Sequence, residues 1–176
     1  MIDIAQDVLK YYLTYQKAPA TSDIEIQDET LLEQSGTIFI TLYKKGNIIG
    51  SAGNIKEIKA SVIHEITENT ISACNDERFT KPKLDEIQDI QIRIDEISDR
   101  FVLGEWELNN IDPTTHGVIV LQKDYSKMAV ILPNIDPKLI TGEDMIPVIS
   151  AKLGQEKWSP SDSIIYKIDT KQTTNF

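Results

Sequence analysis

The sequence predicts an α+β fold built from mainly antiparallel sheets and packed helices. Several short segments alternate apolar and polar residues with the period of two that is typical of half-buried strands. Other segments repeat apolar residues at helical spacing. Short turns join strands in pairs, and the helices fall between them at irregular intervals. This arrangement favours antiparallel pairing.

The N-terminal elements are a helix and a hairpin. The predicted helix covers residues 3–16, where apolar side chains recur at helical spacing (Val8, Leu9, Tyr12 and Leu13). A polar connection, 17–35, leads into a strand over residues 37–43, whose alternate residues share one face. Gly46-Asn47 tolerates positive φ and predicts a hairpin turn. Ile48-Ile49 should then pair back against the first strand.

A second helix and a central strand are predicted next. Residues 61–74 carry an apolar stripe, and Ser61 is placed to cap the free amides of that helix. We expect His64 and Glu68 to form a surface pair one turn apart on it. The segment 90–97 begins by alternating isoleucine with polar residues, which predicts a half-buried strand.

The C-terminal part of the chain predicts another hairpin, a helix and a last strand. Two strands, 118–121 and 128–132, flank a turn at 123–126. A helix around 147–153 should stop at Gly154, because glycine accepts the left-handed C-cap conformation. Alternation over 164–168 predicts the last strand, and the tail from Lys171 is expected to be frayed. Trp106 and Trp158 are predicted to be packing anchors.

Length and composition indicate a single soluble domain. A chain of 176 residues fits one domain, which we assign to residues 1–170, as one lobe or two, followed by a tail at 171–176. No apolar run approaches the roughly 20 residues that span a bilayer, and no secretory signal is visible at the N-terminus. The single cysteine, Cys74, excludes an internal disulfide and is expected to be a small buried residue. We therefore expect a cytoplasmic protein.

The charge is unevenly distributed. A formal net charge of -10 argues against general nucleic-acid binding, because neutralising phosphates requires an excess of lysine and arginine. Residues 44–83 nevertheless hold seven cations and five anions, so this segment carries +2 and the remainder -12. A positive region of this kind would attract a small anion or an acidic partner. A solvated fringe of lysines is the alternative.

Six short motifs follow one another along the chain in a characteristic order: Ile48–Gly53, Asp76–Phe79, Ile90–Ile97, His116–Val120, Ala151–Gly154 and Trp158. In that order they resemble the AMMECR-type domain family, whose members include protein A of the AmmeMemoRadiSam system. The resemblance covers most of the chain and implies a compact two-lobed fold. It also implies an accessory role beside Memo-like and radical-SAM proteins in a modification pathway. It implies no defined reaction, cofactor or substrate.

One motif departs from the family pattern at two chemically important positions. The family has Leu-Arg-Gly-Cys-Ile-Gly where this chain has Ile48–Gly53, so Ile49 replaces an arginine and Ser51 replaces a cysteine. A serine needs an adjacent base to act as a nucleophile, whereas a cysteine is intrinsically nucleophilic. Loss of the arginine removes a planar anion-binding group. A family activity that uses these two side chains would be lost or changed here.

Ser51 and His116 are the candidate catalytic residues. Ser51 would be a nucleophile, or its hydroxyl would only support the turn. His116 precedes a glycine at the start of a strand, where an imidazole can face a cleft as acid, base or donor. A hydrogen-bonded structural histidine is the alternative. With two histidines and one cysteine in the whole chain, we predict no conventional zinc site.

Four further residues are candidates for ligand binding. Gly50 and Gly53 would let the backbone approach a ligand, or would satisfy the geometry of a turn. Lys56 would add positive charge after them. Arg78 would bind a carboxylate or phosphate, or would form a structural ion pair.

Three functions follow from these residues. The first is an accessory protein that binds a small ligand or a partner. The second is an enzyme acting on an anionic small molecule in a cleft near Gly50–Gly53, Arg78 and His116. The third is a pseudoenzyme scaffold that keeps the fold after loss of the cysteine. The departures at Ile49, Ser51 and Ala52 favour the first and third over the second.

Overall fold

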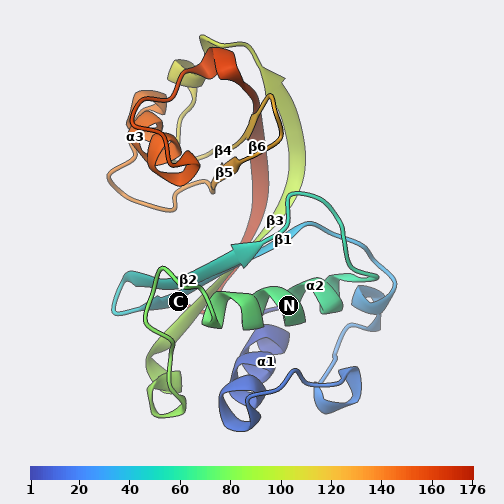
Figure 1. Ribbon diagram of the computed structural model, residues 1–176. Helices are drawn as coiled ribbons and strands as arrows, with labels where there is room; N and C mark the ends of the chain where they lie inside the picture. The colour runs from blue at the N-terminus through green and yellow to red at the C-terminus, as the bar shows by residue number, and fades with distance from the viewer. The chain divides into compact units, whose positions relative to one another are not determined.

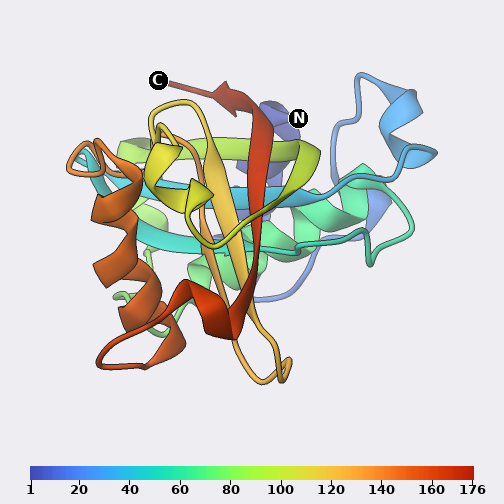
Figure 2. The ribbon, with the colours of Figure 1, turned by 90° about the horizontal axis from the view of Figure 1, so that it is seen from above.

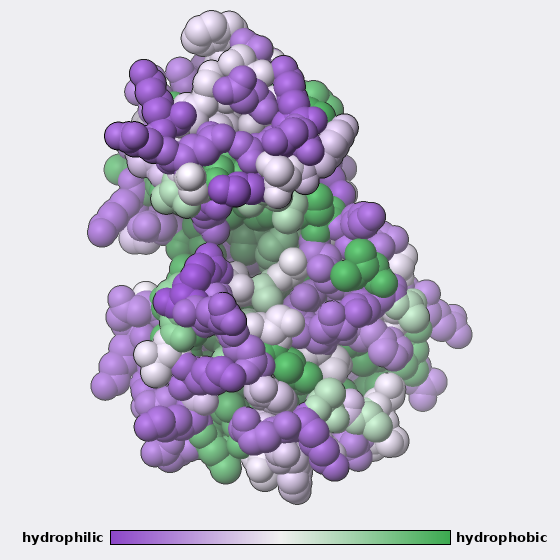
Figure 3. Space-filling model, viewed as in Figure 1, coloured by the Kyte–Doolittle hydropathy of each residue, from purple (hydrophilic) through white to green (hydrophobic).

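The computed structural model describes residues 1–176 and confirms the α+β prediction (Figure 1). Its strands form a six-stranded sheet in the order β2-β1-β3-β6-β4-β5. The pairs β1–β2, β1–β3, β4–β5 and β4–β6 are all antiparallel. None of the helices combines the length and the apolar character that crossing a membrane would require. Most of the surface drawn in Figure 3 is hydrophilic.

The chain divides into two compact units. Unit 1 comprises Met1–Glu96 together with Gln172–Phe176, and unit 2 comprises Ile97–Lys171. The division falls within two long strands, β3 (Ile90–Leu103) and β6 (Ser163–Thr174), which contribute residues to both units.

In unit 1, one helix lies against a hairpin and a second helix packs on the first. Helices α1 (Ile2–Tyr15) and α2 (Val62–Cys74) pack together, and α2 lies against β1 (Ile38–Lys44) and β2 (Asn47–Gly53) (Figure 1). The core consists of the apolar stripes that the sequence predicts, and its members include Val8, Leu9, Ile38, Ile40, Leu42, Ile63, Ile66, Ile92 and Ile94. Hydrophobic burial therefore fixes which face of the hairpin meets the helices.

The first hairpin turn lies one residue earlier than predicted. Lys45 and Gly46, rather than Gly46-Asn47, have positive φ, at 51° and 76°. A two-residue turn of the type that matches strand twist needs positive φ at both central positions. Asn47 therefore begins β2, and a bulge at Ile49 shifts the register between Leu42 and Tyr43.

In unit 2, a helix packs on a second hairpin. Strands β4 (Gly117–Gln122) and β5 (Met128–Ile131) are joined by the predicted turn, in which Tyr125 has a φ of 58°. Helix α3 (Gly142–Leu153) lies against β5 (Figure 2). The core of unit 2 gathers apolar side chains from all of these elements, including Val118, Val120, Ile131, Met145, Ile149, Leu153 and Trp158.

Helix α3 begins five residues before the predicted start. Its end is as predicted, because Gly154 takes a left-handed φ of 64°. Its start is set by Thr141, whose amide and hydroxyl both donate to the carboxylate of Asp144, at 2.8 and 3.0 Å. Pro147 lies inside the helix on an exposed side, so the missing amide costs one hydrogen bond without breaking the helix.

The C-terminal tail is part of the sheet, not frayed. Strand β6 continues to Thr174, and Asn175 then bonds twice to Ile92. The backbone amide of Asn175 donates to the Ile92 carbonyl at 3.3 Å, and its side-chain oxygen accepts from the Ile92 amide at 2.7 Å. These bonds continue the pairing between β3 and β6 by one residue past the end of β6.

Three side chains differ from their predicted roles. Trp158 is buried as expected, but Trp106 is 83% exposed and anchors no core. Ser61 does not cap α2, because its hydroxyl bonds to the His64 ring at 2.8 Å. Glu68 pairs with Lys59 and not with His64.

One buried hydroxyl of α2 has no hydrogen-bond partner. Thr70 is fully buried and its Oγ1 is unsatisfied. A buried hydroxyl without a partner costs about 1–3 kcal/mol. We therefore expect Thr70→Val to raise the free energy of unfolding by about 1 kcal/mol in a urea titration. Thr41→Val is the matched control and should lower it, because the buried Thr41 hydroxyl is bonded to Ser51 at 3.1 Å. A Thr70→Val protein less stable than the parent would contradict this account.

Candidate functional site

Ser51 lies on β2, at the edge of the sheet, opposite Thr41 of β1. The Ser51 hydroxyl bonds to the Thr41 hydroxyl at 3.1 Å, and its backbone amide donates to the Asp76 carboxylate at 3.0 Å. The side chain therefore meets another hydroxyl rather than a base. Neither contact activates Ser51 as a nucleophile, and its catalytic role remains a prediction.

Asp76 and Arg78 clamp the outer edge of β2 at Ser51. The guanidinium of Arg78 grips Asp76 with two hydrogen bonds, from Nε at 2.8 Å and from Nη2 at 2.6 Å. Nη2 also donates to the Ser51 carbonyl at 3.4 Å. The side chain of Asp76 is only 8% exposed, whereas that of Arg78 is 55% exposed. We call Ser51, Asp76 and Arg78 the β2 clamp.

The β2 clamp favours the ionised form of its carboxylate. Burial raises the pKa of Asp76, but hydrogen bonds from the Arg78 guanidinium and the Ser51 amide outweigh burial and lower the pKa overall. The hydrogen bond to Asp76 likewise raises the pKa of Arg78. These contacts also satisfy the backbone amide and carbonyl of Ser51, which would otherwise be free to pair with a strand of another chain.

The two predicted ligand-binding glycines each allow a close packing contact. A Cβ at Gly50 would collide with the backbone carbonyl of Ala73, at the end of α2. A Cβ at Gly53 would collide with the ring of Phe39, its cross-strand partner. Neither glycine has positive φ, so turn geometry is not the reason for them. A backbone approach to a ligand at these glycines remains a prediction.

Lys56 is exposed in the loop that follows β2. Glu65 of α2 holds that loop by hydrogen bonds. The Glu65 carboxylate is fully buried and accepts four hydrogen bonds of 2.8 to 3.1 Å, from the amides of Ile58 and Lys59 and the side chains of Asn54 and Asn69. The Lys59 side chain is paired with Glu68, whereas that of Lys56 has no ion pair. Lys56 is thus a free charge on a fixed loop.

A buried ion pair lies inside the sheet of unit 1. Arg93 and Asp95 of β3 form two hydrogen bonds, of 2.7 and 2.8 Å, and both side chains are almost fully buried. Tyr43 is close enough to interact with both charges, and burial raises the pKa of its phenol. The alternation of this strand had predicted that its polar face would be only half buried, so the depth of this pair was missed.

Cys74 is buried as predicted. Burial raises the pKa of its thiol to about 12, so the thiolate is absent near neutral pH.

His116 belongs to unit 2, whereas the other predicted site residues belong to unit 1. Its Nδ1 lies 2.5 Å from the carboxylate of Asp169, and both side chains are about one-third exposed. Sequence analysis missed Asp169. Asp169 is identified by the sheet register, in which Gly117 of β4 pairs with Ile168 of β6 and the residue just before β4, His116, therefore lies opposite Asp169.

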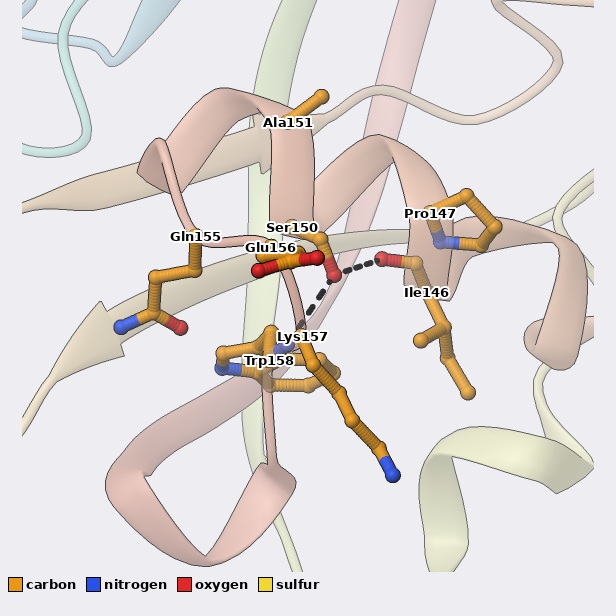
Figure 4. Close-up of a pocket in the computed structure, with 8 residues that line it drawn as sticks. All are labelled: Ile146, Pro147, Ser150, Ala151, Gln155, Glu156, Lys157 and Trp158. Carbon is orange, nitrogen blue, oxygen red and sulfur yellow. Dashed lines mark hydrogen bonds between the residues drawn. The ribbon is translucent and has the colours of Figure 1, made fainter.

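The surface beside α3 holds a hollow of about 460 Å³ (Figure 4). Ser150 lines it, and its hydroxyl donates to the Ile146 carbonyl at 2.9 Å and accepts from the Trp158 amide at 3.3 Å. The Trp158 indole donates to Ser163 at 2.9 Å. These bonds join the end of α3 to the chain that follows, and none of the predicted site residues lines this hollow.

Comparison with known proteins settles the family. The sequence profile of the AMMECR1 family matches residues 2–171. The chain belongs to the AMMECR1 family. The AMMECR1 chain is 31% identical over 139 residues to Protein CA_C1420 of Clostridium acetobutylicum, an alignment that covers 77% of this chain. It spans only 28% of that relative's length.

The fold of this AMMECR1 protein also has a solved counterpart. The crystal structure of the uncharacterised protein PH0010 from Pyrococcus horikoshii superimposes with a TM-score of 0.80 at 18% identity. The superposition covers 97% of this chain and 87% of that one. The resemblance to the AMMECR-type family and the predicted fold class are therefore confirmed.

Proposed function

We propose that this AMMECR1 protein is an accessory protein that binds carboxylate or phosphate groups at Arg78 and Lys56 of unit 1. The proposal rests on the exposure and orientation of Arg78. Two of its nitrogens hold Asp76, and Nη1 forms no hydrogen bond within the chain. The guanidinium is thus fixed in place with donors facing solvent.

The chemistry of a held arginine suits anion recognition. Arginine presents planar donors that match carboxylate and phosphate oxygens, and a side chain already ordered by Asp76 loses less entropy on binding. Lys56 adds a second cation on the loop anchored by Glu65. The basic segment 44–83 in an otherwise acidic chain favours approach of a negative group. Arg78 would thereby supply an anion-binding group, whereas Ile49, which stands where the family has an arginine, cannot.

Contacts at Ser51 support binding in preference to nucleophilic catalysis. Its hydroxyl is bonded to Thr41, and its amide is taken by Asp76 and so is not available to stabilise an oxyanion. A pseudoenzyme scaffold with the same fold would show the same contacts at Ser51. The distinction lies in whether Arg78 binds an anion.

The anionic group can come from a free small molecule or from the acidic surface of a partner protein. The family resemblance points to Memo-like and radical-SAM proteins as partners in a modification pathway. Capture of such proteins by the purified chain, weakened by a change at Arg78, would support the second source. Binding of small anions alone would support the first.

We expect Arg78→Gln to weaken binding of inorganic phosphate, citrate or a polyglutamate peptide about tenfold, measured by calorimetry at low salt. A hydrogen bond to a charged group is worth about 1.5–3 kcal/mol, and each 1.4 kcal/mol is a factor of ten. Arg78→Lys should recover part of the affinity, because it keeps the charge but loses the planar donors.

Lys56→Gln should weaken binding less than Arg78→Gln does. Lys171→Gln is its matched control, because Lys171 is an exposed lysine of unit 2. Binding of the peptide but not of phosphate or citrate would indicate an acidic partner, and the reverse would indicate a free anion. Equal affinities for the parent, Arg78→Gln and Lys56→Gln proteins would overturn the proposal.

A further inference from the structure

His116 and Asp169 form an oriented pair on unit 2, whereas the proposed anion site belongs to unit 1. Nδ1 of His116 and the carboxylate of Asp169 are 2.5 Å apart, within hydrogen-bond distance. An ionised carboxylate can only accept, so Nδ1 carries the proton of this bond. In the neutral ring Nε2 is then left with its lone pair. One-third of the His116 side chain is exposed, so a ligand can reach the ring.

The backbone on the N-terminal side of His116 is held by a turn. The Asp112 carbonyl accepts the amides of Thr115 at 3.1 Å and of His116 at 2.9 Å. The Asp112 carboxylate also holds Thr114, through its amide at 2.9 Å and its hydroxyl at 2.6 Å. The carbonyl of Pro113 accepts the amide of Asn134 at 2.7 Å, which ties this turn to the segment after β5.

The backbone on the C-terminal side of His116 is held by close packing. A Cβ at Gly117 would collide with the Ile131 carbonyl and would lie 3.0 Å from the side chains of Pro133 and Ile168. Strand β4 therefore approaches its neighbours more closely here than another residue type would allow. His116 is therefore held by the turn before it, by the close packing of Gly117 after it and by the bond of its ring to Asp169. Such prior ordering is characteristic of functional side chains.

We propose that His116 is a proton acceptor for a hydroxyl-bearing ligand or a bound water, and that Asp169 is its positioning residue. The proton moves from the ligand oxygen to Nε2. The O–H bond breaks, its electron pair stays on the oxygen, and an N–H bond forms on the imidazole. Asp169 holds the tautomer in which Nε2 is free and stabilises the imidazolium that results. No other reactant is required for this step.

A second carboxylate, that of Asp112, lies in the turn that precedes His116. Hydrogen bonds from the Thr114 side chain and backbone lower the pKa of Asp112, and the charge of His116 lowers it further. Asp112 and Asp169 therefore both place negative charge near the imidazolium that forms on proton transfer. The proton acceptor thus has an orienting carboxylate at Nδ1 and a further carboxylate in the turn that precedes it.

The protein provides an internal control for the test. It has two histidines, and the other one, His64, bonds through Nδ1 to the hydroxyl of Ser61 rather than to a carboxylate. Long-range proton–nitrogen NMR spectra of the nitrogen-15-labelled chain at alkaline pH report the tautomer of each ring. His64→Gln assigns the two sets of signals.

We expect the Nδ1–H tautomer at His116 in the parent protein and in Asp169→Asn, whose amide oxygen can still accept from Nδ1. Asp169→Ala should switch His116 to the Nε2–H tautomer and leave His64 unchanged. Slow cleavage of p-nitrophenyl acetate, which needs an accessible imidazole lone pair, should be lost in His116→Gln and retained in His64→Gln. A parent protein with the proton on Nε2, or equal cleavage by the two histidine variants, would overturn the proposal.

Discussion

Glu65→Ala is expected to lower the free energy of unfolding by about 3 kcal/mol or more. The Glu65 carboxylate is fully buried and accepts four hydrogen bonds, two from backbone amides of the loop that carries Lys56. Each buried donor left without a partner costs about 1–3 kcal/mol. Removing the acceptor would also release the loop from α2. Urea unfolding, followed by far-UV circular dichroism, measures the change directly.

Two further variants test whether the loss of stability comes from the buried carboxylate and not from a general change in α2. Glu68→Ala lies almost one turn later on α2 and removes an exposed carboxylate paired only with Lys59, so we expect a change within about 0.5 kcal/mol. Glu65→Gln keeps one acceptor oxygen and should fall between the two. If Glu65→Ala and Glu68→Ala were equally stable, Glu65 would not anchor the loop.

Asp95→Ala is expected to cost about 3–5 kcal/mol, because it leaves the guanidinium of Arg93 buried without its main partner. Replacing both charges together, as Arg93→Met with Asp95→Leu, should restore much of the loss. A buried ion pair often contributes little more than apolar residues of similar volume, whereas half of one is strongly destabilising. Thermal unfolding of the single and double variants provides the comparison.

A matched change outside the core checks the same reasoning. Lys44 and Glu86 form a partly exposed ion pair of 2.6 Å in the same unit. Glu86→Ala should cost much less stability than Asp95→Ala, because solvent screens such a pair. Asp95→Ala as mild as Glu86→Ala, or a double variant less stable than Asp95→Ala, would contradict the assignment of Arg93 and Asp95 as a structural pair.

The sequence predicts the apolar faces of this fold well. The stripes of α1 and α2 and the alternation in β1 and β3 identify most of the unit 1 core, because hydrophobic burial acts through simple periodicity. Boundaries were harder to predict. Pro147 suggested a late start for α3. The helix nevertheless begins at Gly142, because a capping interaction between Thr141 and Asp144 outweighs the cost of an internal proline.

The site was predicted less completely, because its partners are set by tertiary structure. Arg78 lies only two residues from its partner Asp76 in the sequence, yet the contact of both with Ser51 depends on where the chain leaves α2. Asp169 becomes visible only once the register of β4 against β6 is known. Gly50 likewise owes its place to α2, which packs too closely on β2 to admit a side chain.

Amide NMR spectra recorded during titration with inorganic phosphate test the central claim most directly, because they locate binding as well as detect it. We predict saturable shifts at Ser51, Lys56 and Arg78, with the response lost in Arg78→Gln while the remaining spectrum stays folded. Saturable shifts confined to unit 2, or no saturable shift in unit 1, would contradict anion binding at the β2 clamp.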